Sequence, residues 1–532
     1  MRRGSLPAGI AAVVSATLFL AGCVPGADDG ALPDGPDTLR ILAGSEVKDM
    51  VPILEDAAEE TGVKVVFEYT GTLEGTELVA SGGAAGRYDA TWFPNNRYLS
   101  LLPGAGQEIS ESVRIMSSPV VLGLRSDVAE RLGWDAEPPT WAELAEAAAA
   151  GDFTYGMTNP AASNSGFSAL VAVATALSGT GTALQERDIE SVTPEMTKFF
   201  SAQKLTAGSS GWLAEKVVSE PDTVDGLINY ESVLMGLELG GAPATIVTPS
   251  DGVVTSDYPL TLLQSATGKK EKFDALTDWL TTPEVQERIV REVHRRPAVP
   301  GVDTGGVFGD EVLFETPFPG TIDVANALIS TYLDTVRAPS QSVFVLDTSG
   351  SMAGERIDAL KASLSGLSGA DTSTTGSFNQ FRVRERITLL PFDDVPGAPT
   401  VVDVPETDKS GALEEIRSVT DGLHAEGGTA IYDSLREAYE VAVAQRAERP
   451  DTFVSIVLMT DGENANGSDA ADFEYYYAGL GPDARGIPVF VVLFGDGDVD
   501  ELTRVAELSG GQVFDALNGD LAGAFQEIRG YQ

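Results

Sequence analysis

A short apolar run that ends in acidic and hydroxyl side chains places the strongest constraint on the fold of this chain. The run Val343–Met352 contains Asp347-Thr348-Ser349-Gly350-Ser351, a D-x-S-x-S pattern. A continuous apolar run of this length is typical of a strand buried in a parallel sheet. In open α/β sheets, ligands bind beyond the carboxyl ends of the strands. The sequence therefore predicts a polar binding site at the edge of a parallel sheet.

Two later segments carry side chains of the same chemical kind. One is Gly427-Gly428-Thr429. The other is the segment Ile456–Gly462, in which an apolar run is followed by Asp461. Carboxylate and hydroxyl oxygens suit a hard divalent cation such as Mg²⁺, which takes oxygen ligands in near-octahedral geometry.

These segments, in this order, resemble the von Willebrand factor A (VWA) domain and its metal-ion-dependent adhesion site. The succession of strands and helices over residues 341–532 also resembles that family, which implies a Rossmann-like doubly wound sheet. In the family the metal keeps one coordination position for an acidic side chain of a protein partner. The resemblance implies Mg²⁺, or Ca²⁺ or Mn²⁺, held by Asp347, Ser349, Ser351, Thr429 and Asp461. The alternative is a vestigial site whose polar residues only cap helices.

A second stretch, Asp496-Gly497-Asp498-Val499-Asp500 with Glu507, has some of the spacing of a calcium-binding loop. However, Glu501 stands where such a loop needs a glycine for its turn. Acidic residues at the start of a helix complement the helix dipole. We therefore expect a helix cap here.

The first 23 residues have the pattern of an export signal. Arg2 and Arg3 precede an apolar stretch, Ile10–Leu20, that is too short to span a bilayer. Leu20-Ala21-Gly22-Cys23 resembles the lipobox of bacterial lipoproteins, which implies cleavage before Cys23 and its lipidation. We expect a cell-membrane protein anchored by lipid and facing away from the cytoplasm. An ordinary secretory signal with an incidental cysteine is the alternative.

Cys23 is the only cysteine, so no internal disulfide can form. Residues 24–37 are rich in Pro, Gly and Asp, which predicts a flexible tether.

From residue 38 short apolar strands alternate with helical patterns. We expect strands at Leu39–Leu42, Lys64–Tyr69 and Ala90–Phe93, with a helix at Glu46–Thr61. Alternation of this kind predicts an α/β fold with a mostly parallel sheet. Further helices are predicted to begin at Thr140, with Glu143 completing a capping box, and at Thr282-Pro283.

Four segments of residues 38–302 resemble the two-lobed extracellular solute-binding proteins of bacterial import systems. They are Ile41–Glu46, Met116–Val121, Gly226–Glu231 and Arg295–Pro297. The resemblance implies a type II periplasmic-binding-protein-like domain in which the chain crosses between lobes near Ser117–Leu124 and Thr245–Val254. Lobe two would then cover about Gly123–Ala244.

A cleft between such lobes would bind a small polar or anionic solute. Hydroxyl and amide side chains at predicted helix starts and at the first crossing are the candidate contacts: Ser45, Ser117, Ser118, Asn159, Ser163 and Tyr230. The alternative is that these residues only cap helices and form turns.

Residues 303–340 join the two domains. Apolar residues recur at helical spacing between Ile322 and Val336. We expect one amphipathic helix that packs against one of the two domains.

The charge of the chain excludes one class of partner. With 80 acidic and 35 basic residues, the net charge is −45, so a nucleic-acid partner is ruled out. Catalysis is not expected either, because neither of the two histidines, His294 and His424, pairs with a nucleophile in a recognisable pattern.

The sequence thus predicts a lipid-anchored binding protein outside the cytoplasm. Its VWA domain would bind an acidic protein partner through a metal ion, and its two-lobed domain would bind or sense a second ligand. The alternative is the solute receptor of an ABC-type importer with an accessory VWA domain.

Overall fold

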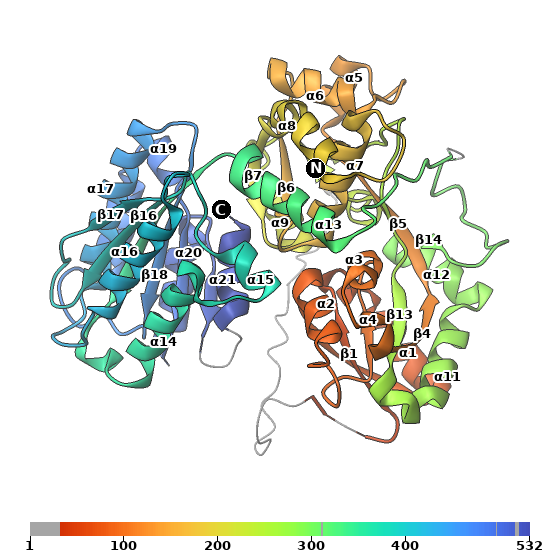
Figure 1. Cartoon of the computed structure of the whole chain (residues 1–532), viewed down its shortest axis with the longest axis horizontal. Coiled ribbons are helices and arrows are strands. Elements are labelled where there is room, and N and C mark those ends of the chain that lie inside the picture. The colour runs from red at the N-terminus through yellow and green to blue at the C-terminus, as the bar shows by residue number, and fades with distance from the viewer. Residues whose placement is uncertain (1–31, 34, 310–311, 496, 517–520, 532) are drawn as a thin grey trace, which may run out of the picture.

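The computed structural model describes residues 32–33, 35–309, 312–495, 497–516 and 521–531. Cys23, with the rest of the expected export signal, and Asp496 lie outside these residues. Figure 1 shows two halves, a two-lobed N-terminal domain and a C-terminal α/β domain beside it. Among the described residues, no helix has the length and apolar character needed to cross a membrane.

Lobe one is built on a five-stranded sheet with the order β2-β1-β3-β13-β4. The strands are β1 (Thr38–Ala43), β2 (Lys64–Tyr69), β3 (Ala90–Trp92), β4 (Ile109–Arg114) and β13 (Pro259–Leu263). The first three are parallel, whereas β13 runs antiparallel to both of its neighbours. Helices α1 (Val51–Thr61), α2 (Thr72–Ala80), α3 (Arg97–Leu101), α4 (Ala105–Glu108), α11 (Lys270–Leu280) and α12 (Pro283–Val293) complete the lobe. The helix expected from Glu46 starts as a separate 3-10 helix, Ser45–Met50, before α1.

Lobe two has the strand order β11-β5-β8-β6-β7. Its strands are β5 (Met116–Leu124), β6 (Tyr155–Thr158), β7 (Gln203–Ala207), β8 (Gly226–Tyr230) and β11 (Thr245–Val247). A small hairpin of β9 (Glu238–Leu239) and β10 (Ala242–Pro243) lies outside this sheet. The helices are α5 (Ser126–Leu132), α6 (Trp141–Ala150), α7 (Asn164–Ser178), α8 (Glu186–Phe200), α9 (Ser210–Ser219) and α10 (Glu231–Leu234).

Strand β5 carries the chain from one lobe to the other. Its first residues pair with β14 (Arg296–Pro297), its middle with β12 (Thr255–Ser256), and its end with β11. The chain therefore crosses at β5, where the first crossing was expected, and returns at β12, just after the second predicted segment. A third crossing at β14, absent from the sequence prediction, leads into the linker.

The linker helix packs on lobe two. Helix α13 (Ile322–Thr331) continues into a π-helical turn, Tyr332–Val336. Its apolar face joins the core of lobe two, where the rings of Phe200 and Tyr332 lie 5.1 Å apart. The Tyr332 hydroxyl donates to Gln203 at 3.1 Å.

The C-terminal domain is a doubly wound sheet with the order β17-β16-β15-β18-β19-β20. Its strands are β15 (Ser340–Asp347), β16 (Arg386–Phe392), β17 (Thr400–Asp403), β18 (Phe453–Thr460), β19 (Val489–Leu493) and β20 (Val513–Asp515). All pairs are parallel except β16 with β17. The helices are α14 (Glu355–Ser365), α15 (Thr374–Asn379), α16 (Lys409–Asp421), α17 (Ile431–Glu448), α18 (Ala470–Ala478), α19 (Pro482–Arg485), α20 (Val499–Leu508) and α21 (Leu521–Gly530).

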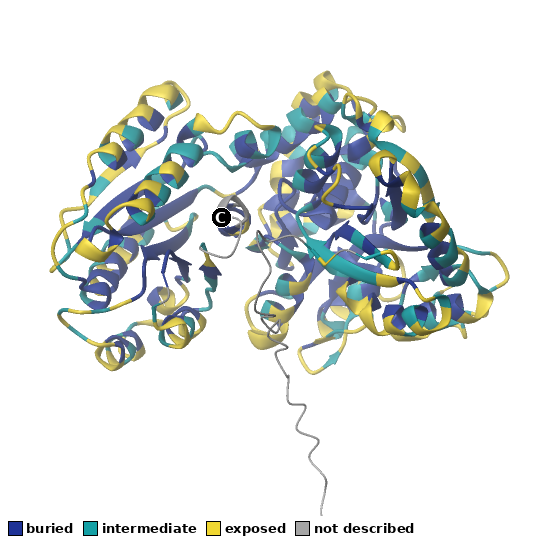
Figure 2. Ribbon diagram, turned by 90° about the horizontal axis from the view of Figure 1, so that it is seen from below, coloured by how far each residue is buried: buried dark blue, intermediate teal, exposed yellow. Residues whose placement is uncertain are grey.

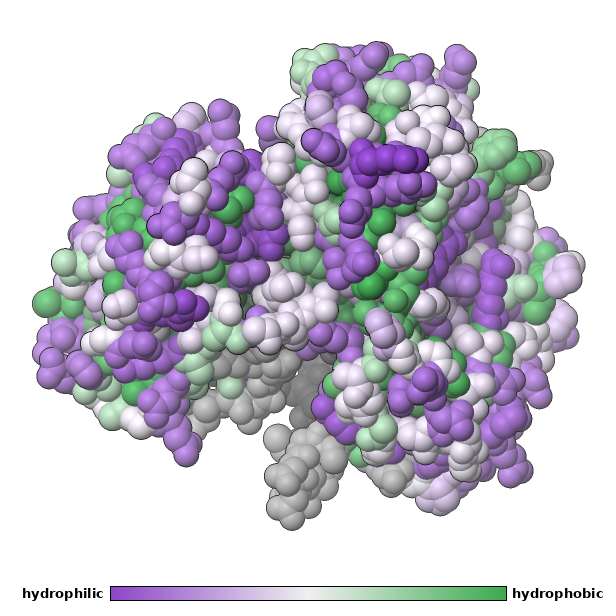
Figure 3. All heavy atoms as spheres, viewed as in Figure 1, coloured by the Kyte–Doolittle hydropathy of each residue, from purple (hydrophilic) through white to green (hydrophobic). Residues whose placement is uncertain are grey.

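The sheets of both halves form buried cores, and polar residues cover the outside. In Figure 2 the inner strands of the sheets are dark blue, and much of the outward helix surface is yellow. Hydrophilic residues dominate the face shown in Figure 3, as the excess of acidic side chains predicts.

Helix starts follow the sequence predictions in part. Thr140 and Glu143 form the predicted capping box of α6. Asp498 accepts a hydrogen bond from the Glu501 amide at 2.9 Å, so this residue caps α20 as expected. Thr282 precedes α12 but does not cap it, because its hydroxyl donates instead to the carbonyl of Trp279 at 2.9 Å.

Candidate functional site

The five predicted metal ligands lie at the switch point of the C-terminal sheet. Strands β15 and β18 are adjacent there, and the strand order reverses on either side of them. Asp347 ends β15, Asp461 follows β18, and Thr429 precedes α17. In open α/β sheets this position is where ligands bind.

Backbone hydrogen bonds hold the three loops together. The Gly350 amide donates to the carbonyl of Gly427 at 3.1 Å, which joins the first loop to the second. The amides of Ala465 and Asn466 both donate to the carbonyl of Thr429 at 2.9 Å, which joins the second loop to the third. The fold thus brings together the three segments that are far apart in the sequence.

The first loop presents a carboxylate and two hydroxyls. The Oγ atoms of Ser349 and Ser351 lie 2.9 Å apart. Asp347 accepts from the Ser349 amide at 2.8 Å and from the Thr460 hydroxyl at 2.6 Å. Burial raises the pKa of Asp347, and these hydrogen bonds oppose the rise.

Asp461 has one carboxylate oxygen paired and one unpaired. Its Oδ2 accepts from the guanidinium of Arg356 at 2.7 Å. Its Oδ1 is buried and has no hydrogen-bond partner among the residues that the structure describes. Because an unpaired buried carboxylate oxygen is costly, this atom needs a positive or donating ligand.

The donor set fits a hard divalent cation. Asp347, Ser349, Thr429 and Asp461 are buried, while Ser351 is exposed. No group of three or more His, Cys, Asp or Glu side chains suited to a metal occurs within the described ranges. The candidate site has two carboxylates and three hydroxyls, and hydroxyl oxygens can also serve as ligands for Mg²⁺ and Ca²⁺.

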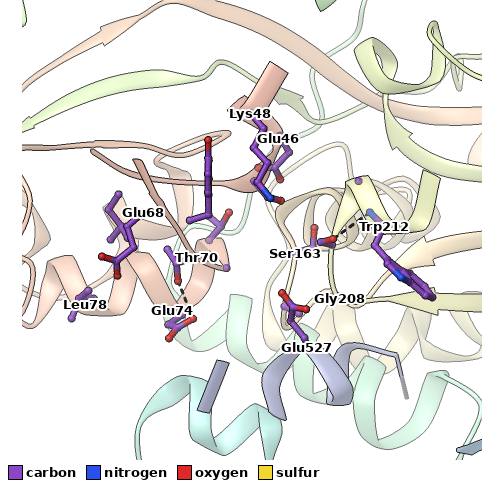
Figure 4. Close-up of a pocket in the computed structure, with 18 of the residues that line it drawn as sticks. Glu46, Lys48, Glu68, Thr70, Glu74, Leu78, Ser163, Gly208, Trp212 and Glu527 are labelled. Atoms are coloured by element: carbon purple, nitrogen blue, oxygen red, sulfur yellow. Dashed lines mark hydrogen bonds between the residues drawn. The ribbon is translucent and has the colours of Figure 1, made fainter. Parts of the chain in front are cut away.

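A second candidate site is a cavity of about 800 Å³ where three parts of the molecule meet. Figure 4 shows segments of lobe one, lobe two and the C-terminal domain around it. Lobe one contributes the turn after β1, the end of β2 and the start of α2. Lobe two contributes Ser163 and the start of α9, and the C-terminal domain contributes Gln512, Glu527 and Tyr531.

Acidic side chains outnumber basic ones around the cavity. The carboxylates are Glu46, Glu68, Glu74, Glu215 and Glu527, and the cations are Lys48 and Arg87. Both cations have partners: Lys48 lies over the ring of Tyr69 at 4.9 Å, and Arg87 pairs with Glu68 at 3.4 Å.

Two of the glutamates have a raised pKa. Burial raises the pKa of Glu46, against the opposing effects of hydrogen bonding and the charge of Arg295. Burial also raises the pKa of Glu527, and the nearby charge of Lys48 opposes this rise. One oxygen of Glu46, Oε2, is buried with no hydrogen-bond partner in the described part of the chain.

Only two of the six predicted cleft residues, Ser45 and Ser163, line this cavity. The other four make internal hydrogen bonds instead. Ser117 Oγ accepts from Arg114, and Ser118 Oγ accepts from the Ser232 amide. The side chain of Asn159 accepts a hydrogen bond within its own loop and donates one to the Arg529 carbonyl. The buried Tyr230 hydroxyl accepts a hydrogen bond from Asn164 and donates one to Glu46.

The sequence prediction missed the charged and aromatic residues that line the cavity. Lys48 and Tyr69 lie on the turn after β1 and at the end of β2, positions that face a cleft in a two-lobed fold. Glu527 and Tyr531 belong to the other domain, and no signal within the first 302 residues could have identified them.

Each half of the chain matches the model of a known protein family. Residues 39–292 match the model of the bacterial extracellular solute-binding protein family, and residues 342–463 match that of the von Willebrand factor type A domain. The chain combines a solute-binding domain with a VWA domain. The first match also indicates an extracytoplasmic location.

Two curated relatives share short regions with this chain. An uncharacterised protein of Synechocystis sp. is 30% identical over 133 residues, which is 25% of this chain and 27% of the relative. The inter-alpha-trypsin inhibitor heavy chain H4 of Sus scrofa is 32% identical over 131 residues, 24% of this chain and 12% of the relative. The chain thus spans about a quarter or less of the length of these relatives.

Solved structures similar to this chain include two binding proteins. The ferric binding protein from Campylobacter jejuni is 12% identical with a TM-score of 0.41, covering 55% of this chain and 96% of its own. The periplasmic binding protein AfuA from Actinobacillus pleuropneumoniae, with fructose-6-phosphate bound, is 14% identical with a TM-score of 0.44, covering 56% and 98%.

Proposed function

We propose that this chain is a lipid-anchored extracytoplasmic binding protein whose VWA domain binds an acidic group of a protein partner through a divalent cation. One observation carries the proposal, namely the buried Oδ1 of Asp461, which has no partner among the described residues and lies at the switch point of the sheet. Asp347, Ser349, Ser351, Thr429 and Asp461 would hold Mg²⁺, or Ca²⁺ or Mn²⁺.

A partner carboxylate would complete the site. Two carboxylates and three hydroxyls leave a divalent cation short of a full set of six ligands, so one position is open to an external oxygen. The remaining surface is strongly acidic, with a net charge of −45. A metal ion at the sheet edge would therefore be the positive point through which an acidic partner could bind.

An affinity capture of surface proteins tests this proposal. The full chain is used as bait with Mg²⁺, with a chelator, and as the Asp461→Ala variant. A partner retained only by the parent chain with Mg²⁺ supports the proposal. The matched control is Asp472→Ala, which removes a carboxylate at the exposed start of α18 and should leave capture unchanged. Equal capture by the parent chain and the Asp461→Ala variant overturns the proposal.

The two-lobed domain would bind a small polar solute that is neutral or positively charged. Five carboxylates against two basic groups around the cavity disfavour an anion. A ligand that binds only the folded state raises the melting temperature. Thermal shifts of the full chain with neutral, cationic and anionic solutes test the solute class, and stabilisation by anions alone would contradict it.

The solute receptor of an ABC-type importer is the second candidate function. The complete two-lobed fold with a cavity of about 800 Å³ favours it. A membrane permease captured equally with Mg²⁺ and with a chelator would support this function over the first.

Lipid anchoring rests on the sequence around Cys23. The Cys23→Ser variant should incorporate no labelled palmitate and should leave the membrane fraction. Membrane retention of that variant without any lipid label would show that Cys23 is not the anchor.

A further inference from the structure

The VWA domain contacts both lobes of the solute-binding domain. On lobe one, the carboxylate of Glu77 in α2 accepts hydrogen bonds from the first turn of α15. The donors are the Thr374 amide at 2.9 Å, the Thr375 amide at 3.0 Å and the Thr375 hydroxyl at 2.8 Å. A charged acceptor that takes several donors at a helix start makes a strong, directional contact.

On lobe two, the contact is made by α21 and the residue that follows it. Tyr531 packs on Trp212 with ring centroids 4.4 Å apart. The backbones of Gly208 and Gly530 approach so closely that a Cβ at Gly530 would lie 2.5 Å from the Cα of Gly208. The side-chain amide of Asn159 in lobe two also donates to the backbone carbonyl of Arg529 at 3.2 Å.

Within the VWA domain these two contact points are joined. Arg529 of α21 donates to the carbonyl of Asn379 at 2.9 Å and to that of Gln380 at 3.1 Å, both at the end of α15. The same guanidinium forms a buried ion pair with Glu385 at 2.9 Å. Helices α15 and α21 are therefore joined to each other, so the contacts to the two lobes come from one connected unit of the VWA domain.

The lobes are connected by narrow crossings and by direct contacts, such as the hydrogen bond that the Asn95 side chain of lobe one donates to Asn164 of lobe two at 2.9 Å. They are linked through β5, β12 and β14, and β12 and β14 are each two residues long. Rotation of the lobes about these crossings would change the distance between Glu77 and Gly208, which the VWA domain spans. The cavity lies between the same two lobes, with Glu527 of α21 at its edge in Figure 4.

We infer that the VWA domain is a clamp on the solute cleft: it forms the third wall of the cleft and holds the two lobes at one opening. Any change of that opening requires α15 to leave Glu77 or α21 to leave lobe two. This inference goes beyond the proposed function, because it holds whatever the cleft or the metal site binds.

Distance measurement between the lobes tests the clamp without a ligand. Spin labels are placed on the full chain at two exposed helix positions, Glu59→Cys in lobe one and Glu190→Cys in lobe two, with Cys23→Ser removing the native thiol. Pulsed electron paramagnetic resonance then gives the distribution of lobe-to-lobe distances. We expect a narrow distribution in the parent chain, and a broader one after Glu77→Ala or Trp212→Ala.

Glu143→Ala is the matched control. It also removes a glutamate that accepts a hydrogen bond at a helix start, but within lobe two and away from the VWA domain. Its distribution should equal that of the parent. A distribution unchanged in both Glu77→Ala and Trp212→Ala, or equally broad in the parent chain, overturns the clamp. Circular dichroism of each variant separates loss of the clamp from loss of the fold.

Discussion

The guanidinium of Arg356 donates to Oδ2 of Asp461 at 2.7 Å and leaves Oδ1 of the same carboxylate without a partner among the described residues. Arg356 also donates to the carbonyl of Ser351 at 3.2 Å, so it bridges the first and third loops of the candidate metal site. A positive charge therefore lies beside the five oxygens proposed to hold a cation.

Removal of this charge should strengthen cation binding. In the Arg356→Ala variant, Asp461 would no longer share its charge with a guanidinium, and repulsion of the metal would fall. Arg356 is partly exposed, so solvent screens its charge, and we expect the free energy of Mg²⁺ binding to change by about 1 kcal/mol. This corresponds to roughly five-fold tighter binding. Isothermal titration of the full chain with Mg²⁺ measures it. The control is Arg504→Ala, at an exposed position on α20, which should leave Mg²⁺ binding unchanged. Weaker binding by the Arg356→Ala variant would contradict the prediction and show that Arg356 supports the site.

The sequence predicted that the loops of the candidate metal site lie at the sheet edge, because the apolar strands before Asp347 and Asp461 mark that edge. It could not predict Arg356. Whether a residue in the first turn of α14 faces the site depends on the 3-10 turn Gly350–Met352 and on the left-handed backbone of Gly354, at φ 85°. Neither of these features has a clear sequence signal.

Glu385 should be essential for the stability of the VWA domain. It is buried and forms ion pairs with Arg337 of the linker and Arg529 of α21. Removal of one partner from a buried ionic cluster leaves uncompensated charge and costs about 3–5 kcal/mol. Glu385→Gln should therefore lower the free energy of unfolding by roughly this amount. Urea denaturation measures the loss, with Glu415→Gln at an exposed position on α16 as a control. A loss as small as the control's would contradict the role of Glu385.

The contribution of Glu385 should depend on pH. Burial disfavours its charged form, but Arg529 and Arg337 outweigh burial and hold its pKa below the ordinary value of 4.5. A carboxyl with a lowered pKa stabilises the fold above its unfolded-state pKa and loses that effect as the pH falls through its folded-state pKa. The difference in unfolding free energy between the parent chain and Glu385→Gln should thus be constant near neutrality and shrink below pH 4.5. A difference that grows in acid would contradict this account.

The lining of the cavity between the lobes was less predictable from the sequence than the loops of the candidate metal site. The alternation of strands and helices along residues 38–302 predicts an α/β fold, and the resemblance to solute-binding proteins implies the two lobes. The six candidate contacts, in contrast, rest only on polar side chains at predicted helix starts and at the first crossing. Ser117 and Ser118 belong to β5, whose pairing with β12 and β14 buries them at the crossing. Tyr230 is likewise buried, at the end of β8. The wall supplied by Glu527 and Tyr531 arises from the packing of two domains, which no local pattern encodes.

Gly530 should control the seating of the VWA domain on lobe two. A methyl group at this position would meet the backbone of Gly208 at 2.5 Å, so Gly530→Ala must push α21 away from the lobe. Overpacking of this kind costs about 1–3 kcal/mol. Hydrogen exchange should then accelerate in β7 and α9 of lobe two and in the VWA residues around Tyr531, while β1 and β2 of lobe one stay protected. The control is Gly481→Ala, where the added methyl meets no atom within 4 Å. Exchange that rises equally in β1 and β2 would indicate general destabilisation instead, and unchanged exchange around Tyr531 would show that the contact with Gly208 does not seat the domain.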